Sequence, residues 1–160
     1  MGSQKKKKKF AWRAEQDRLA TLKGLQKKNM LMGSAICRLC GEAQEDADHL
    51  FVSCYTSTLL WQKVSEWCNI PQLYAFSIRD PFQVHKGVIA SEHKRCLLQV
   101  IILASCWAIW KARNDLIFNG KRVSLDRIFG EMQVLAFLWI RNRSKTNNTD
   151  WDTWVNFSFS

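Results

Sequence analysis

Three cysteines and one histidine stand close together in the first third of the chain. Cys37, Cys40, His49 and Cys54 fall within 18 residues and follow the spacing C-x2-C-x8-H-x4-C. Thiolate sulfur and imidazole nitrogen are ligands that Zn²⁺ prefers, and a C-x2-C turn presents two thiolates to one ion. Gly41 suits the end of such a turn, where the backbone often needs a positive φ. The spacing predicts one zinc ion bound by the three cysteines and the histidine.

All four predicted ligands come from the protein, so the coordination shell has no position for water or a substrate. A closed shell of this kind is typical of structural zinc. The alternative is that the cysteines are buried apolar residues and that His49 caps a helix. That alternative has to explain why three of the six cysteines and one of the three histidines occur in this one segment. We therefore expect one structural Zn²⁺.

Positive charge is concentrated at the N-terminal end of the chain. Residues 1–30 carry ten Lys and Arg against two acidic residues, whereas residues 31–160 carry fourteen against twelve. A basic arm suits nucleic acid, an anionic membrane or the nuclear import receptor, and the alternative is a solvated tail that binds nothing. The candidate nucleic-acid contacts are the cations of this arm: Lys5, Lys6, Lys7, Lys8, Lys9, Arg13, Arg18, Lys23, Lys27 and Lys28.

The predicted zinc segment is itself acidic. Between its first and last ligands, the cation Arg38 stands against four acidic residues: Glu42, Glu45, Asp46 and Asp48. Three thiolates on one Zn²⁺ add a further net negative charge. On this count the zinc segment repels phosphate, and any contact with nucleic acid is assigned to the basic arm.

The N-terminal sequence and the cysteines also predict a compartment. No apolar region of a signal peptide follows Met1, and six cysteines without such a signal indicate a reducing environment. Five consecutive lysines resemble a nuclear localisation signal, so we expect an intracellular, nuclear protein. The longest apolar run, at 97–110, is shorter than the ~20 residues that span a bilayer. It therefore predicts a buried helix and no membrane partner.

Apolar periodicity predicts a mainly α fold of about four helices around one long apolar helix, with a small CCHC zinc knuckle. Residues 70–90 are expected to form a loop, because two prolines and a glycine interrupt them. A short helix at His49 should end or bend before Cys54, since residues five apart diverge on an ideal α-helix. The predicted helices cover 10–25, 56–68, 92–118 and 124–140.

Three regions follow from this pattern: a disordered basic tail at 1–9, a helical domain at 10–140 and a polar tail at 141–160. Trp151, Trp154 and Phe157 are expected to dock back from the polar tail, and exposed aromatic rings near the two tryptophans would suit a partner. Trp107 and Trp110 could stack on bases, but their place at the end of an apolar helix favours core packing. The same reasoning assigns three cysteines outside the zinc segment to the core: Cys68, Cys96 and Cys106.

Several groups of residues together resemble a known family. They are Phe10-Ala11-Trp12-Arg13 with Asp17-Arg18-Leu19, Cys37-x2-Cys40-Gly41 with Asp48-His49-Leu50-Phe51-x2-Cys54, Trp61-x2-Val64-x2-Trp67, and Trp107-x2-Trp110-Lys111-x-Arg113-Asn114-x2-Ile117-Phe118. Their order and spacing over residues 9–120 resemble the zinc-binding domain at the C-terminus of reverse transcriptases from plant LINE-type (non-LTR) retrotransposons.

This resemblance implies that Cys37, Cys40, His49 and Cys54 are zinc ligands. It also implies a parent polyprotein, an RNA-directed DNA polymerase with an endonuclease, that acts on RNA and nuclear DNA. The family usually has a proline where Ala20 stands, so the first helix is expected to run on here. A polymerase needs paired aspartates for two catalytic metals, and no Asp-Asp pair occurs in the chain, so we expect no enzyme activity.

Two functions remain open at this stage. The first is a non-catalytic zinc-binding module, derived from a retrotransposon reverse transcriptase, that assists RNA or DNA binding through its basic N-terminal arm. The second is a structural or protein-interaction domain in which zinc only stabilises the fold. Its partner would be a reverse transcriptase or another protein.

Overall fold

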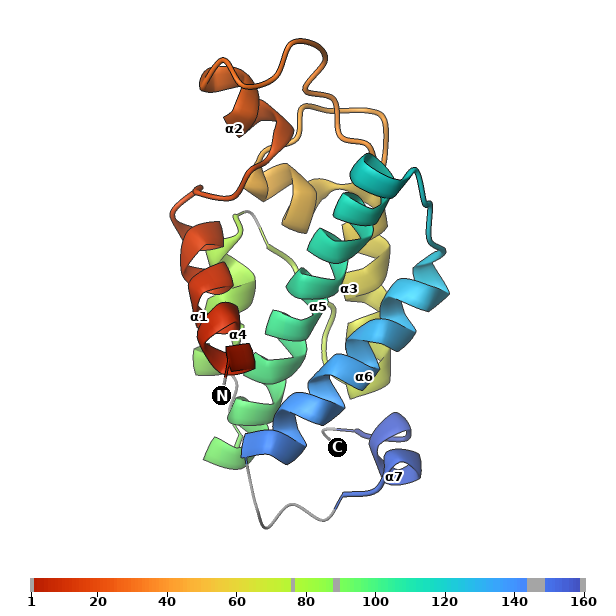
Figure 1. Ribbon diagram of the computed structural model, residues 1–160. Coiled ribbons are helices and arrows are strands. Elements are labelled where there is room, and N and C mark those ends of the chain that lie inside the picture. The colour runs from red at the N-terminus through yellow and green to blue at the C-terminus, as the bar shows by residue number, and fades with distance from the viewer. Residues whose placement is uncertain (1, 76, 88–89, 144–148, 159–160) are drawn as a thin grey trace.

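The computed structural model describes residues 2–75, 77–87, 90–143 and 149–158, and this part of the chain is mainly helical (Figure 1). A long helix, α5 (Glu92–Asn119), runs through the middle of the molecule. α6 (Leu125–Arg143) packs along α5 and also contacts α3 (Tyr55–Cys68), while α1 (Gly2–Glu15) and α4 (Arg79–Gly87) lie on the opposite side of α5. The predicted mainly α fold around one long apolar helix is confirmed. Three shorter elements complete it: α2 (Leu22–Lys27), the π-helix η1 (His49–Ser53) and α7 (Trp151–Val155).

The ends of α5 follow from the residues that flank it. Ser91 Oγ accepts a hydrogen bond from Lys94 N at 3.3 Å, which caps the first turn. Gly120 adopts a left-handed φ of 63° and ends the helix close to the predicted end at residue 118. Ile101 and Ile109 in the middle of α5 are fully buried. A helix that is apolar on all sides is stable only when other elements surround it, and α4 and α6 provide this cover.

α5 is longer than the apolar run that predicted it. Over its 28 residues it is long and apolar enough to cross a membrane by length and composition, unlike the 97–110 run considered above. In the apolar stretch of α5 that meets this criterion, 56% is buried inside the fold. This burial is what the core helix of a globular domain requires.

The helix predicted from Ser124 is confirmed as α6, which continues to Arg143. Ser124 Oγ accepts a hydrogen bond from Arg127 N at 3.3 Å and caps the helix. The buried residues of α6 recur every three or four positions, so they form one face against α5 and α3. They are Ile128, Met132, Ala136, Trp139 and Ile140.

The polar tail predicted at 141–160 differs from the structure at both of its described ends. Residues 141–143 belong to α6, and α7 folds back so that Trp154 is 2% exposed, whereas Trp151 is 39% exposed. Trp154 Nε1 donates to Gln133 O at 3.0 Å, and the rings of Trp154 and Trp67 meet edge to face at 5.2 Å. The predicted docking of the C-terminal aromatics is confirmed for Trp154, which is therefore not an exposed ring for a partner. Residues 144–148 lie outside the described part.

The disordered tail predicted for residues 1–9 is corrected by α1, which begins at Gly2. Phe10 and Ala14 anchor this helix by burying their side chains, and Phe10 meets the ring of Trp107 edge to face at 5.1 Å. Lysine has a good intrinsic helix propensity, and a like-charge pair at i,i+4 costs only about 0.2–0.5 kcal/mol. The helix therefore extends from its anchored end through the lysines.

The predicted continuation of this helix to Leu25 is wrong. α1 ends at Glu15, and Asp17 takes a left-handed φ of 50°. The next residues make tertiary hydrogen bonds instead: Ala20 O accepts from Arg113 Nη2 at 3.0 Å, and Leu22 N donates to Glu45 Oε1 at 2.9 Å. These contacts use backbone groups that a continuous helix would have paired internally. The helix therefore ends before Ala20, although no proline stands there.

The loop predicted at 70–90 contains a helix, α4. Pro81 lies in its first turn, where the missing N–H has no helical partner in any case. Ile78 and Phe82 are buried on the face towards the core, which explains why this segment folds. Proline and glycine therefore mark the borders of this helix rather than a structureless loop.

Candidate metal centre

A tight turn presents the first two cysteines. Gly41 N donates to Cys37 O at 2.8 Å, and Gly41 has the positive φ, 75°, that the sequence predicted. Below this turn, Cys37 N donates to Ala43 O at 2.8 Å, and Glu45 N donates to Ala35 O at 2.8 Å. These two bonds form a short antiparallel pairing at the base of the turn. The pairing fixes the direction in which both thiols point.

A π-helix, η1, presents the histidine and the last cysteine. Two residues five positions apart point about 140° apart on an α-helix with 3.6 residues per turn. In η1 the Cys54 N–H instead bonds His49 O at 2.7 Å, the i→i+5 bond of a π-turn, and this wider turn brings the two residues to one side. The expected departure from an α-helix before Cys54 is confirmed, and the structure identifies it as a π-turn.

Side chains of α3 hold the wide turn of η1 in place. Ser57 Oγ donates to Leu50 O at 2.5 Å, and Trp61 Nε1 donates to Phe51 O at 2.8 Å. Both donors are buried. They satisfy carbonyl groups that the π-turn leaves without partners, which would otherwise cost about 1–3 kcal/mol each. Trp61 thus acts on the centre by shaping the segment that carries His49.

The four ligand atoms converge on one point. The sulfur atoms of Cys37, Cys40 and Cys54 and a ring nitrogen of His49 all lie within 4.8 Å of one another. Cys37 Sγ and Cys54 Sγ are 4.0 Å apart, and Cys40 Sγ lies 3.2 Å from His49 Nε2. A tetrahedral zinc site separates two sulfurs by about 3.8 Å and a sulfur from a nitrogen by about 3.5 Å. The cluster fits one tetrahedral Zn²⁺ with three thiolates and one imidazole.

The histidine is oriented for coordination through Nε2. Its other nitrogen, Nδ1, lies 3.3 Å from Ser53 Oγ, and its backbone N–H donates to Asp46 Oδ1 at 2.8 Å. A partner on the second ring nitrogen fixes the ring orientation of a metal-binding histidine. Asp46 therefore caps the backbone N–H of His49, and Ser53 supports the ring.

The sulfur atoms of Cys37 and Cys54 also interact with each other. Their hydrogen bond lowers the pKa of Cys54 and, together with burial, raises the pKa of Cys37. A coordinating Zn²⁺ favours the thiolate form of every cysteine that it binds, so metal and protons compete for this pair. A Zn²⁺ bound by these four residues would compensate the thiolate charge and cross-link the segment, because all four positions of its shell would be protein ligands.

A buried ion pair joins the zinc segment to α5. The side chains of Arg113 and Glu45 are 2% and 0% exposed, and Arg113 Nη2 donates to Glu45 Oε1 at 2.6 Å. Arg113 Nε lies 3.1 Å and 3.2 Å from the two carboxylate oxygens, and Leu22 N donates to the same Oε1. Burying a charge is costly unless it is paired and hydrogen-bonded. This pair therefore fixes the 20–22 segment, the zinc segment and α5 relative to one another.

The acidic character inferred for the zinc segment is smaller than its composition suggested. Glu45 is neutralised by Arg113, and Asp46 pairs with Lys23 at 2.9 Å. Asp48 accepts a hydrogen bond from Ile78 N at 2.7 Å, which ties the segment to α4. Two of the four acidic charges are thus balanced by cations, and the argument that this segment repels phosphate is weakened.

Sequence reasoning missed the pairing of Glu45 with Arg113. An arginine on the buried side of an apolar helix does indicate an anionic partner. The sequence offers four neighbouring acidic residues between Cys40 and His49, however, and gives no means of choosing among them. The choice depends on the short antiparallel pairing that turns Glu45 inward.

Comparison with known families supports the zinc assignment. Residues 2–61 match the family described as zinc-binding in reverse transcriptase. The matched segment contains all four metal-ligand candidates. No curated protein and no solved structure matches the chain significantly. The residues between 62 and 120 that resemble the family lie outside the matched segment. Among them, Trp107 and Trp110 are partly buried and pack against Phe10 at the edge of the core.

The predicted nucleic-acid contacts are spread over α1, α2 and the turn between them. Lys5, Lys9 and Arg13 are exposed and occur at four-residue spacing along α1, so they form one stripe. Lys23 differs, because its hydrogen bond and ion pair with Asp46 raise its pKa and balance its charge. The Lys7 side chain lies outside the described part. The remaining candidates are all exposed: Lys6, Lys8, Arg18, Lys27 and Lys28.

Proposed function

We propose that this chain is a non-catalytic zinc module of a LINE-type reverse transcriptase from a plant retrotransposon, and that it binds RNA or DNA through the basic face of α1. The zinc part of this proposal rests on the four converging ligands and the family match over residues 2–61. The nucleic-acid part rests on a different observation, the organisation of the basic arm as a helix.

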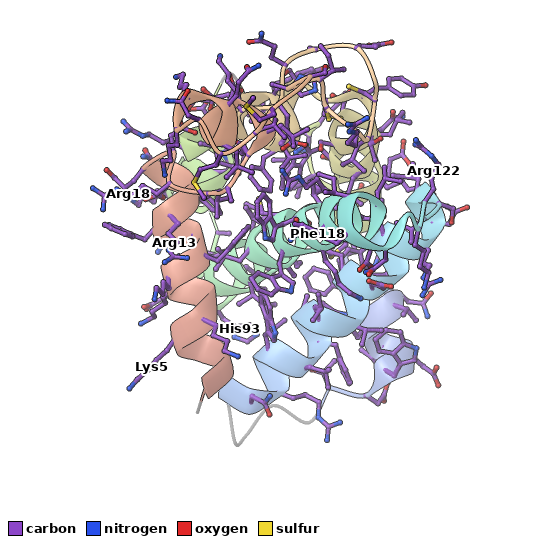
Figure 2. The ribbon with its side chains drawn as sticks, turned by 45° about the horizontal axis from the view of Figure 1, so that its top comes forward. Lys5, Arg13, Arg18, His93, Phe118 and Arg122 are labelled. Atoms are coloured by element: carbon purple, nitrogen blue, oxygen red, sulfur yellow. The ribbon has the colours of Figure 1, made fainter. Side chains whose placement is uncertain are left out.

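Because the N-terminal lysines lie in the helix α1, their side chains form a basic surface at fixed spacing. Lys5, Lys9 and Arg13 are exposed along one stripe of α1, beside the face that buries Phe10 and Ala14. Figure 2 shows Lys5 and Arg13 on the outer side of α1. None of these three cations forms an ion pair with another described residue, so their charge is available to phosphate groups. Contacts of this type depend on salt and carry little sequence information.

The proposal is tested by the salt dependence of binding. Fluorescence anisotropy with a labelled single-stranded oligonucleotide should show affinity that falls steeply between about 50 and 200 mM KCl. Replacing Lys5, Lys9 and Arg13 by Gln should reduce the slope of log K against log salt by about 2, at about 0.7 per lost phosphate contact. A control with the same loss of charge replaces three exposed cations on other elements by Gln: Lys86, Lys121 and Arg143.

The two triple variants distinguish a localised contact from net charge. The control should keep the slope of the unmodified protein. Equal slopes in the two variants would show that net charge, not the α1 face, controls binding. No binding of RNA or DNA at about 50 mM salt would reject the nucleic-acid role. The zinc assignment would survive that result, since it depends on different residues.

A second function has its own support in the structure. The buried Glu45–Arg113 pair and the closed ligand shell link the zinc segment to the helical core, as expected if zinc only stabilises the fold. Val134 and Leu138 of α6 are 45% and 47% exposed, which leaves apolar surface for a protein partner such as the reverse transcriptase itself. Copurification with the polymerase together with absence of nucleic-acid binding would favour this function.

Nuclear localisation is part of the same proposal. Its support is the run Lys5–Lys9, whose described side chains are exposed on α1. A fluorescent fusion of the full chain should accumulate in nuclei, and the same fusion with these lysines replaced by Gln should not. Equal distribution of both fusions would remove the import role of the arm.

A further inference from the structure

An exposed tryptophan on α1 has no part in the core. Trp12 is 49% exposed, although its neighbours Phe10 and Ala14 are buried. In a continuous helix over 10–25, Trp12 and Leu19 would share one face, but the break after Glu15 separates them, and only Leu19 is buried. A large exposed aromatic side chain is unusual enough to indicate a contact outside the domain.

One cation contacts this indole ring, and two more lie one helical turn away. The Arg18 guanidinium lies 5.0 Å from the ring centroid, within the range of a cation–π contact. Lys8 and Lys9 are four and three residues before Trp12, which places them one turn away on the same face of α1. Both lysines are exposed. Figure 2 shows Arg18 beyond the end of α1, on the same outer side as Lys5 and Arg13.

We propose that Trp12 and Arg18 form a stacking position for an unpaired base, and that Lys8 and Lys9 bind the phosphates beside that base. The occupant is therefore single-stranded nucleic acid. This proposal deepens the proposed function, on which it rests, because it adds a contact with the base to the contacts with phosphate. Aromatic rings and guanidinium planes stack on any base, while flanking cations follow the backbone.

The charge around the ring selects this occupant. An apolar protein surface would have to strip water from the exposed cations near Trp12, whereas a nucleotide supplies the anion and the flat aromatic face together. A double helix keeps its bases stacked inside, so it can use the cations but not the ring. Trp151 offers a comparison, since it is 39% exposed but meets the ring of Phe137 instead of a guanidinium.

The experiment separates base contacts from phosphate contacts. The full chain, loaded with zinc, is titrated against oligothymidylate of about 12 nucleotides, against an abasic oligomer of equal length and against a duplex of equal length. Trp12→Ala should weaken oligothymidylate binding about 5- to 20-fold and leave abasic and duplex binding unchanged, as expected for loss of one stacked base. Trp151→Ala serves as the matched control and should bind all three ligands normally.

Folding is checked in the same samples. Because Trp12 is exposed, Trp12→Ala should retain the helical circular dichroism and the zinc content of the unmodified protein. Arg18→Lys keeps the charge but loses the planar group, and it should weaken oligothymidylate binding more than abasic binding. These two variants together identify a base contact that a change in charge cannot explain.

Each remaining outcome overturns a defined part of the proposal. If the unmodified protein binds oligothymidylate and the abasic oligomer equally, or if Trp12→Ala loses nothing, the stacking position does not exist and the phosphate contacts remain. If the duplex binds as tightly as oligothymidylate and Trp12→Ala weakens both, the ring contacts something other than an unpaired base. If none of the three ligands binds, the proposed nucleic-acid function fails, and the stacking position fails with it.

Discussion

Replacing Arg113 by Met should destabilise the fold more than most single changes in this chain. Met has a similar length but no charge, so the Glu45 carboxylate would stay buried at 0% exposure without its counter-ion. The carboxylate would keep its hydrogen bond from Leu22 N, while Ala20 O would lose its donor. This one substitution thus affects the contacts among the 20–22 segment, the zinc segment and α5.

The expected cost is about 3–5 kcal/mol, the range found when one partner of a buried ion pair is removed. This is a large part of the total stability of a domain, which is about 5–15 kcal/mol. Combining Arg113→Met with Glu45→Gln removes both charges, so the double variant should be more stable than Arg113→Met by about 1–3 kcal/mol. The difference between the two free energies of unfolding measures the cost of leaving the Glu45 carboxylate buried without a counter-ion.

Urea unfolding followed by circular dichroism, with zinc held in excess, measures these free energies of unfolding. The matched control is Lys111→Met, two residues earlier on α5, which removes the ion pair between Lys111 and Glu131. That pair has a similar distance, 2.7 Å, but its side chains are 48% and 31% exposed. Its loss should cost no more than about 1 kcal/mol, because solvent screens exposed pairs.

Two results would refute this reasoning. If Arg113→Met and Lys111→Met cost the same, burial would not determine the strength of the Arg113 pair. If the double variant with Glu45→Gln is as unstable as Arg113→Met, the loss would come from packing or from the Ala20 contact rather than from an unpaired charge. The same conclusion would follow if the loss of stability in the double variant equalled the sum of the losses in Arg113→Met and Glu45→Gln measured separately.

Three other predictions concern the zinc centre and the core. Cys40→Ser should lose its zinc, measured as metal per chain, together with part of the helical signal, since structural zinc contributes directly to folding. In the zinc-loaded protein, iodoacetamide should modify Cys96 fastest at neutral pH, as read by peptide mass spectrometry, because Cys96 is only half-buried and not in the core as expected, whereas Cys68 and Cys106 are buried. Burial raises the pKa of Cys68 to about 12, which keeps that thiol protonated and unreactive, and zinc protects the ligands. Trp154→Ala should cost about 3–5 kcal/mol in urea unfolding, and Trp151→Ala less than about 1.5 kcal/mol.

Each of these predictions has a contrary outcome. Full zinc content in Cys40→Ser would remove this residue from the ligand set. Modification of Cys68 at the rate of Cys96 in the native protein would show that its thiol is accessible. Equal losses of stability for Trp154→Ala and Trp151→Ala would contradict the docking of α7 on α6 and α3.

Local patterns alone were sufficient for the long helices and for the metal ligands. α5 and α6 were predicted with nearly correct ends, because apolar periodicity and the caps at Ser91, Gly120 and Ser124 are local signals. The zinc ligands were predicted because three Cys and one His at this short spacing are typical of a zinc site. In both cases the residues that decide the structure are close together in the sequence.

The remaining features depend on residues that are far apart in the chain. α1 ends at Glu15 because the following backbone bonds Arg113 and Glu45, and α4 forms because Ile78 and Phe82 reach the core. The π-turn at His49 is stabilised by α3, through the donors of Ser57 and Trp61. Lysine propensity permits α1, but the burial of Phe10 and Ala14 anchors it. The energies of helix and coil differ by only about 1 kcal/mol per residue in such segments, so a few tertiary contacts decide between them.

Residue types and their spacing were enough to predict four soft ligands for one zinc ion, a basic arm and one long apolar helix. The surroundings of these residues depend on packing. Packing buries Glu45, which the charge count of the zinc segment included, and leaves Trp12 exposed within the predicted 10–25 helix. The physical reason is that ligand type and charge belong to single residues, whereas burial depends on which distant segments pack together.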